Sequence, residues 1–305
     1  MSKKKCTNQK FSFIINPQAA NRKWGRKNKL RDYLKDNLSG EIIHVQGSKR
    51  DTIEKAKEMS LAHTKIVAVG GDGTVADVIQ GIIEAQRGKK TILGILPFGS
   101  GNAFRKSLGV PRSVKKAVSF LSEGVIREID LISVEEKTAG FASVGATAKV
   151  TEMKLQHNIQ GLFGHLLAAR ILSTLPRDER EIELIDGIDD SGKHFDKKIL
   201  NIRFFDCVIG KTNYFGYSWK IAPKAKIDDG FLDITLFETS WLKYLLCFPL
   251  IYFGFYQRTQ KHYKAKKIII RGQNLPVQYN GEFLGSKDKI EFKVLPRALK
   301  VIAKK

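Results

Sequence analysis

The chain has 305 residues, of which 42% are hydrophobic and 10% aromatic, so it can bury a sizeable core and is neither disordered nor fibrous. Its net charge of +22 comes from 53 Lys and Arg against 31 Asp and Glu, which favours anionic partners. The 3 cysteines stand far apart without CxxC spacing, which indicates a reducing compartment and argues against a cysteine zinc site.

The first half of the chain alternates short β-branched runs with amphipathic segments. The runs predict strands at Phe11–Ile15, Glu41–Val45, Lys65–Val69 and Thr91–Ile95, and the amphipathic segments predict helices at Gly25–Leu38, Asp51–Leu61 and Thr74–Gln86. Strands that alternate with helices indicate a mostly parallel sheet with crossover helices. Ligands bind at the carboxyl ends of the strands in such sheets, so function is expected in the loops that follow the strands.

Beyond about Asp130 the pattern becomes rich in strands. They are predicted at Val125–Val134, Phe141–Ala148, Arg180–Ile185, Lys198–Ile209, Phe231–Phe237, Lys266–Ile270, Ile290–Val294 and Leu299–Ala303, and helical patterns interrupt them at about 150–175 and 239–256. This composition favours an antiparallel, β-rich second domain over a continued α/β fold. The predicted domains are residues 1–130 and 131–305.

The apolar segments of the chain predict neither a signal peptide nor a membrane-spanning helix. The basic N-terminus is followed by an apolar run of only FSFII, too short for a signal-peptide core, so a cytoplasmic protein is expected. The segment Thr239–Tyr256 is apolar but is broken by Lys243 and Pro249, and a span needs about 20 apolar residues. A buried helix, an interfacial helix or the wall of an apolar pocket remain as interpretations of this segment.

Two blocks carry much of the positive charge. Residues 1–50 hold 13 Lys or Arg against 3 acids, and Tyr256–Gly272 holds 6 against none. Each block is either a surface for an anionic partner or a solvated basic surface without one. Neither block interleaves aromatic residues as a recognisable nucleic-acid module does, so no nucleic-acid partner is expected.

Three loops after predicted strands are rich in turn and polar residues: NPQAAN at Asn16–Asn21, GGDG at Gly70–Gly73 and LPFGSGN at Leu96–Asn102. GGDGT lacks the lysine of a Walker A loop and the third glycine of GxGxxG, but an apolar strand precedes it and a helix is expected from Thr74. Free amides at a helix N-terminus bind phosphate. The alternative is a tight turn in which Asp72 caps the helix.

The second glycine loop is followed at once by two cations. Ser100 and Asn102 in that loop can hydrogen-bond an anionic ligand, and Arg105 and Lys106 can neutralise its charge. Two glycine loops at successive strand ends therefore favour a phosphate-binding site over two unrelated turns.

Carboxylates are the further requirement of phosphoryl transfer, which needs magnesium and a base for the hydroxyl proton. The candidates are Asp72, Asp130 in REIDLI, the pair Asp228 and Asp229 with Asp233 beyond it, and Glu282 in QYNGEFLG. Taken singly, each of them is more typical of a turn or a surface acid. The 6 histidines show no metal-ligand spacing and no GxSxG motif occurs, which argues against a metalloenzyme built on histidine ligands and against a serine hydrolase.

The set of motifs resembles the diacylglycerol kinase catalytic-domain superfamily, which includes bacterial lipid kinases, sphingosine kinases and ceramide kinases. The resemblance runs from about Lys10 to Ala303. It is carried in order by Asn16-Pro17, GGDGT, LPFGSGN, the Asp130 strand, IAPKAKIDDG at Ile221–Gly230, and Asn280-Gly281-Glu282.

The resemblance implies an NAD-kinase-like α/β domain, a C-terminal β-sandwich domain, and ATP with Mg²⁺ as cofactors. The implied nucleotide-site residues are Asn16, Gly70, Gly71, Thr74, Gly99, Ser100 and Asn102. Asp72 and Asp130 would organise magnesium through water, and Glu282 would be the base, helped by Asp72. Asp229 resembles a structural position or a structural cation site.

Two positions depart from the family pattern. Asn280 stands where the family usually has Asp, and Ala103 stands where bacterial diacylglycerol kinases tend to have Asp. If Asn280 only shapes the turn, activity survives; if the family Asp tunes the base or the metal, the rate is lower. The loop around Ser100 is more similar to the sphingosine and ceramide kinase version, which leaves the lipid class open.

The sequence is therefore interpreted as an ATP- and magnesium-dependent lipid kinase. Its partners would be a lipid substrate and, through peripheral association, an anionic membrane surface, with Trp241–Tyr256 bordering the acyl-chain entrance; the resemblance is also compatible with a homodimer. A soluble-substrate kinase of the NAD-kinase type and a nucleotide-binding regulator that has lost catalysis are the alternatives.

Overall fold

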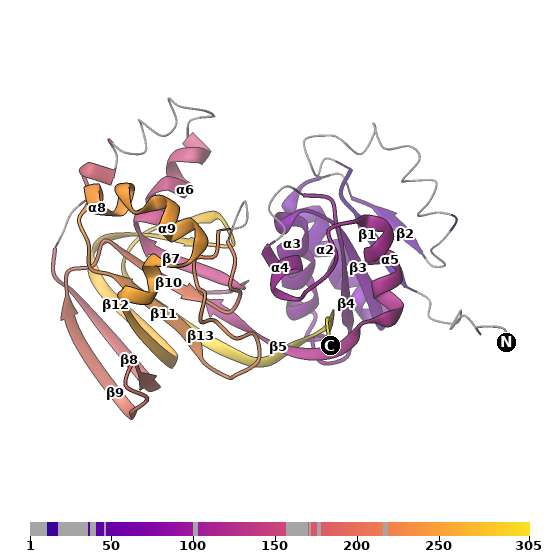
Figure 1. The fold of residues 1–305 in the computed structure, drawn as a ribbon. Coiled ribbons are helices and arrows are strands. Elements are labelled where there is room, and N and C mark those ends of the chain that lie inside the picture. Colours follow the sequence, from indigo (N-terminus) through magenta and orange to yellow (C-terminus); the bar gives the residue numbers. More distant parts are fainter. Residues whose placement is uncertain are drawn as a thin grey trace. The chain divides into compact units, whose positions relative to one another are not determined.

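The structure is a computed structural model, and it describes residues 11–17, 36, 41–45, 47–99, 103–156, 170, 172–175, 178–215 and 219–305. The predicted helix Gly25–Leu38 lies outside these residues except for Asp36. The chain forms two compact units, one of Met1–Ile129 with Arg297–Lys305 and one of Asp130–Pro296 (Figure 1).

The first unit has an α/β fold around a parallel sheet. Its elements are β1 (Ser12–Ile15), β2 (Ile42–His44), α2 (Lys49–Ala62), β3 (Lys65–Gly70), α3 (Asp72–Glu84), β4 (Ile92–Pro97), α4 (Ala103–Ser107) and α5 (Val114–Glu123). The strand order β4-β3-β1-β2 is parallel throughout. β3 and β4 are almost wholly buried because helices cover the sheet, with α2 and α3 packed on each other and α5 packed on β4.

The second unit is β-rich, as the sequence predicts. Its elements are β5 (Val125–Val134), β6 (Lys137–Ala139), β7 (Phe141–Gly145), α6 (Ala146–Gln156), β8 (Arg180–Asp189), β9 (His194–Ile202), β10 (Asp206–Gly210), β11 (Leu232–Phe237), α8 (Trp241–Leu246), α9 (Phe248–Phe253), the 3-10 helix η1 (Tyr256–Thr259), β12 (Lys261–Tyr279) and β13 (Glu282–Ala303). β5 begins in the first unit and β13 ends there.

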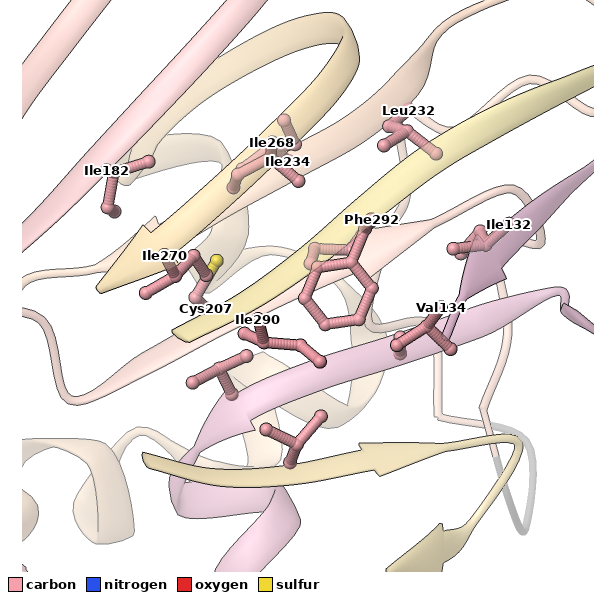
Figure 2. Packing of buried hydrophobic residues seen from close by; sticks show 14 of the residues in the cluster. Ile132, Val134, Ile182, Cys207, Leu232, Ile234, Ile268, Ile270, Ile290 and Phe292 are labelled. Atoms are coloured by element: carbon pink, nitrogen blue, oxygen red, sulfur yellow. The ribbon is translucent and has the colours of Figure 1, made fainter. Parts of the chain in front are cut away.

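β12 organises this sheet because it is paired along both edges. Its first residues pair with β11 and the rest with β13 along one edge, while β8 and then β7 pair along the other, all antiparallel. The apolar side chains of these strands form one core (Figure 2). Phe292, Ile268 and Ile270 in it have 0% exposure, and burying each contributes about 1.5–3 kcal/mol.

Several boundaries differ from the sequence prediction, and two of the differences change the topology. Lys198–Ile209 was expected as one strand, but β9 pairs only with β8 among the described strands, whereas β10 lies between β7 and β11. The chain must change neighbours, so it breaks at residues 203–205, where the sequence RFF has no Gly, Pro, Asn or Asp to signal a turn.

The second difference concerns the domain boundary. β13 was expected as two strands in the second domain, but it runs through Pro296 as one strand with Arg297 at φ 48°. Its end pairs in parallel with β4, through Lys300 with Ile92 and Val301 with Leu93. Residues 297–305 are therefore grouped with the first compact unit, whereas the predicted second domain runs to residue 305.

Asp206, at the start of β10, is a fully buried acid that holds two helices to the sheet. Its carboxylate accepts hydrogen bonds from the Thr147 amide (3.2 Å) and hydroxyl near the start of α6, and from the Tyr244 hydroxyl in α8 (3.2 Å). Burial raises the pKa of Asp206 to about 6, although these bonds and the charge of Arg180 act to lower it. The ionised carboxylate is therefore destabilising at neutral pH.

We predict that Asp206→Asn removes a pH dependence of stability. The pKa of Asp206 is raised from 3.8 when unfolded to about 6 when folded, so its contribution is full below the lower value and is lost as pH rises through the higher one. Between about pH 4 and about pH 7.5 the stability of the asparagine variant should therefore rise relative to that of the wild type by about 2 kcal/mol. Urea unfolding at both pH values measures this gain, and a difference that stays constant with pH contradicts it.

Candidate functional site

The loops that follow β1, β3 and β4 meet at the carboxyl edge of the parallel sheet in the first unit. The Asn16 amide donates to the carbonyl of Val69 (3.3 Å), and the Phe98 amide donates to that of Gly70 (2.8 Å). A Cβ on Gly71 would lie 3.2 Å from the Cα of Gly99, so small residues at these positions let the loops approach. The described parts of all three predicted loops thus lie together. Ser100 and Asn102 lie outside the described residues.

Helix α3 starts at this edge two residues earlier than predicted, with Gly71 as its N-cap and Asp72 in its first turn. The predicted start at Thr74 is therefore corrected. Thr74 is only 5% exposed and packs against Gly70 at the end of β3. The contact is so close that a Cβ on Gly70 would lie 2.4 Å from Thr74 Oγ1, so it requires glycine at position 70. First-turn amides have no partner within a helix, so this terminus can receive an anion.

Asp72 connects two of the loops directly. Its Oδ1 accepts a hydrogen bond from the Ala103 amide at the start of α4 (2.6 Å). The alternative that Asp72 caps the helix after this loop is wrong, because the N-cap of α3 is Gly71 without a side-chain cap bond, and the Asp72 carboxylate instead accepts from the first amide of α4. This contact fixes the half-buried carboxylate beside the helix terminus, and its metal role stays a prediction.

Positive charge gathers next to these loops on and after α4. Burial lowers the pKa of Lys106, and the neighbouring cations Arg105 and Arg112 lower it further. Arg105 is oriented by donating to the carbonyl of Val110 (2.6 Å). Cations that repel one another favour an anionic ligand, which would relieve the repulsion.

Glu282 lies in the second unit, at the start of β13. Asn280 and Gly281 have φ of 49° and 85°, so they form the two-residue turn that joins β12 to β13. Tyr279 pairs with Glu282 across this turn, and its hydroxyl donates to Glu282 Oε2 (2.9 Å). The turn is also held by the buried Gln278, which accepts from the Gly281 amide (3.0 Å). The half-buried Glu282 carboxylate is thereby oriented.

Asn280, one of the two departures from the family pattern, is used structurally in this chain. Its Nδ2 donates to the carbonyl of Thr138 (3.0 Å), and its Oδ1 accepts from the Gly140 amide (3.0 Å). Its own amide donates to the carbonyl of Phe141 (2.9 Å). A carboxylate could not donate to Thr138, so the amide side chain suits this packing better than aspartate would.

Asp130 and Asp229, which the sequence predicts as metal-binding residues, form ion pairs with lysines. Lys211 Nζ lies 3.0 Å from Asp130 Oδ2 and 2.8 Å from Asp229 Oδ1, and Lys264 Nζ lies 2.6 Å from Asp229 Oδ2. Burial raises the pKa of Asp229, but the bonds and charges of these two lysines outweigh it and lower that pKa overall. Within the described ranges no group of three or more His, Cys, Asp or Glu is arranged to hold a metal ion.

Lys211 and Lys264 were not singled out from the sequence. Lysines are usually solvated, and Lys264 was counted within a basic block. One signal is present in the sequence: Lys211 stands directly after the apolar run CVIG, which ends the wholly buried strand β10.

Two family models match the chain. The model described as "Diacylglycerol kinase catalytic domain" matches residues 10–134, and that described as "YegS C-terminal NAD kinase beta sandwich-like domain" matches residues 185–303. Together they cover the first unit's described loops and most of the second unit.

Individual relatives carry related names at modest identity. A "Diacylglycerol kinase" of Bacillus subtilis (strain 168) is 29% identical over 205 residues, which is 65% of this chain and 63% of that protein, so the match spans somewhat less than two thirds of the relative. A "Probable lipid kinase YegS-like" of Enterobacter sp. (strain 638) is 28% identical over 68% of each chain. A crystal structure described as a diacylglycerol kinase from Bacillus anthracis str. Sterne has the same fold, with a TM-score of 0.70, 21% identity and coverage of 97% of both chains.

We predict that Asn280→Asp destabilises the protein at neutral pH. The new carboxylate would face the carbonyl of Thr138 without a proton to donate, so the free energy of unfolding should fall by about 1–3 kcal/mol. The loss should shrink below about pH 4, where the acid regains a proton. Urea unfolding measures both effects. Asn280→Gly keeps the left-handed turn without the charge, and an aspartate variant more stable than this control at neutral pH would contradict the assignment.

Proposed function

Because the chain belongs to the diacylglycerol kinase catalytic-domain superfamily, we propose that it is an ATP- and magnesium-dependent lipid kinase. It would transfer the γ-phosphate of ATP to a hydroxyl of a lipid of the diacylglycerol or sphingoid-base class. The observation that carries this proposal is the convergence of the loops after β1, β3 and β4 at the N-terminus of α3.

The first unit supplies features suited to the nucleotide phosphates. The amides of the first turn of α3 offer donors, and the glycines at 71 and 99 let backbone approach the ligand. The cations on α4 add attraction for phosphate. Asn16, Gly70, Thr74, Ser100 and Asn102 remain proposed nucleotide residues, with Thr74 acting through its packing against Gly70.

Magnesium, when bound with ATP, would neutralise phosphate charge and orient the transferred group. Asp72 suits this ion, because it is a half-buried carboxylate fixed next to the helix terminus by the Ala103 amide. Asp130 and Asp229 suit it less well, because lysine ammonium groups already neutralise them. The proposed metal residue of this chain is therefore Asp72 alone, and no step of the reaction is assigned to Asp130 or Asp229.

Glu282 is the proposed base. As the lipid oxygen forms a bond to the γ-phosphorus and the bond to the ADP oxygen breaks, the hydroxyl proton would pass to the Glu282 carboxylate. The Tyr279 hydroxyl, bound to Oε2, holds the carboxylate in one orientation. The amide of Asn280 is occupied by the turn and contributes no proton acceptor next to this base.

We predict that Glu282→Gln lowers turnover by about 100-fold or more, because removal of a general base typically costs that much, and leaves ATP binding nearly unchanged. Labelled ATP, magnesium and micelles of diacylglycerol, sphingoid base or ceramide measure turnover, and calorimetry measures ATP binding. Glu291→Gln, the same change on the same strand, is the control and should retain activity within about twofold. Normal turnover of the Glu282 variant removes this residue from the role.

The same assay separates the alternatives. Transfer to NAD with none to lipids would identify a soluble-substrate kinase, and ATP binding without transfer to any acceptor would identify a regulator.

We further propose that the α8–α9 surface attaches the enzyme to an anionic membrane. The large apolar side chains exposed on this segment are Leu242 (49%), Leu246 (72%), Leu250 (49%), Phe253 (61%) and Phe255 (54%). The opposite side of the segment is anchored by Tyr244, Ile251 and Tyr256, which are buried in a core with Phe205 and Phe237. Helices of the described chain all fall short of the length and hydropathy needed to cross a bilayer. An apolar face on a firmly packed base is typical of interfacial attachment.

Two cations at the ends of the α8–α9 surface support membrane attachment, whereas most cations of the basic block Tyr256–Gly272 do not. Of the 6 cations of Tyr256–Gly272, 5 have acidic partners: Lys261 with Glu238, Lys264 with Asp229, Lys266 with Asp186, Lys267 with Glu291, and Arg271 with Glu181 and Glu183. The exposed Lys243 on α8 and Arg258, which stacks on Phe255, flank the apolar face. Each such cation near an acidic lipid surface contributes about 1 kcal/mol. A cytoplasmic protein with peripheral membrane association is the location that this proposal implies.

We predict that the double variant Leu246→Ser, Phe253→Ser weakens binding to phosphatidylglycerol-containing vesicles by about 10-fold or more, because it removes two apolar side chains from the contact. Vesicle sedimentation measures binding. Ile199→Ser, which changes a side chain that is 53% exposed on β9, is the matched control and should bind as the wild type does. Activity on a short-chain, water-dispersed lipid should persist in the double variant. Equal losses in both variants, or no vesicle binding by the wild type, would exclude this surface.

A further inference from the structure

Lys211 places a permanent positive charge inside the second unit. The side chain follows the buried strand β10 and is only 1% exposed. Its ammonium group has three N–H donors, and three oxygen acceptors surround it: Asp130 Oδ2 at 3.0 Å, Asp229 Oδ1 at 2.8 Å and the carbonyl of Phe231 at 2.6 Å. This is the set of hard oxygen ligands, two carboxylates and a carbonyl, that a divalent cation would also select.

The acceptors around Lys211 belong to a loop and to the strand on which the loop rests. The Gly230 amide donates to Asp130 Oδ2 (2.7 Å), and the Asp130 amide donates to the carbonyl of Ile227 (2.7 Å). Asp229 Oδ1 also accepts from the Phe231 amide (3.3 Å). The ammonium therefore clamps residues 227–231 onto β5 at Asp130, the first residue of the second unit.

The charges in this cluster are balanced without a metal. Lys211 and Lys264 supply two positive charges, and Asp130 and Asp229 supply two negative ones. A divalent ion added to this set would leave an excess charge of two in a largely buried place, where uncompensated charge is strongly unfavourable.

We propose that Lys211 is a built-in cation that replaces a divalent ion at Asp130 and Asp229, so that the loop 227–231 is held without metal. Any metal dependence of the protein then arises at the nucleotide, and the second unit keeps its structure when divalent ions are removed. The inference concerns folding, and it stands whether or not the chain is a kinase.

Thermal unfolding in the absence of nucleotide tests this proposal. The experiment uses the full chain carrying Asp72→Asn, so that the proposed magnesium carboxylate contributes nothing. The midpoint should change by less than about 1 °C between EDTA and millimolar Mg²⁺ or Ca²⁺, because the cation position is already filled. A rise with either ion that Asp229→Asn abolishes would show that metal binds at this cluster, and it would overturn the proposal.

Replacement of the ammonium should create the metal dependence. Lys211→Met leaves two carboxylates opposite one lysine, so the midpoint in EDTA should fall by about 5 °C or more and recover partly and saturably with Ca²⁺ or Mg²⁺. Lys224→Met breaks the exposed pair with Asp190 and is the control, with no response to either ion. A Lys211→Met protein that is as stable as the control would also overturn the proposal.

A second variant keeps the test decisive if Lys211→Met does not fold. Lys211→Met with Asp229→Asn restores charge balance between Lys264 and Asp130, and it should be more stable than Lys211→Met alone and insensitive to divalent ions. A double variant that remains metal-dependent would place the responsive site elsewhere.

Discussion

The second unit depends on the pairing of β12 along both edges. A buried strand must satisfy its amides and carbonyls, and β12 does so over most of its 19 residues by pairing with β11, β8, β13 and β7, with an interruption at residues 272–274. The end of this long strand has to turn back sharply, which the left-handed pair Asn280-Gly281 allows. Glu282 therefore stands at a rigid hairpin end, with its partner Tyr279 across the turn. The same pairing that builds the core thus orients the proposed base.

Charge is organised differently at the surface and in the interior. The chain carries a net charge of +22, yet several lysines and arginines of the second unit's strands lie next to acids: Lys261 by Glu238, Lys264 by Asp229, Lys267 by Glu291 and Arg271 by Glu183. Large apolar side chains are instead exposed together on α8 and α9. The hydrogen bond from Tyr244 to Asp206 attaches α8 to the sheet. In the first unit the cations on α4 remain close enough to repel one another. Among the described residues, mutually repelling cations therefore lie close to the loops where phosphate is proposed to bind.

The sequence predicted what depends on local pattern and on topology. Parallel strands bring their carboxyl ends to one edge, so the meeting of the loops at Asn16, Gly71 and Gly99 could be expected from the order of strands and helices. The break between β9 and β10 could not be predicted, because RFF at 203–205 has no turn-forming residue and continues a strand-like sequence. The burial of Lys211 also escaped prediction, since its partners Asp130 and Asp229 are distant in sequence and only the fold brings them to it. The structural contacts of Asn280 also escaped prediction, because Thr138 and Gly140, with which its side chain bonds, are distant in sequence.

The parallel pairing of β13 with β4 has a consequence for the order in which the chain folds. The strand that covers the outer edge of β4 lies in residues 297–305, which follow the whole second unit in the sequence. During synthesis the first unit therefore waits, with a hydrophobic strand edge exposed, while more than half of the chain is still being made. The loops after β1, β3 and β4 are therefore encoded early, whereas the sheet that carries them is completed only by residues 297–305.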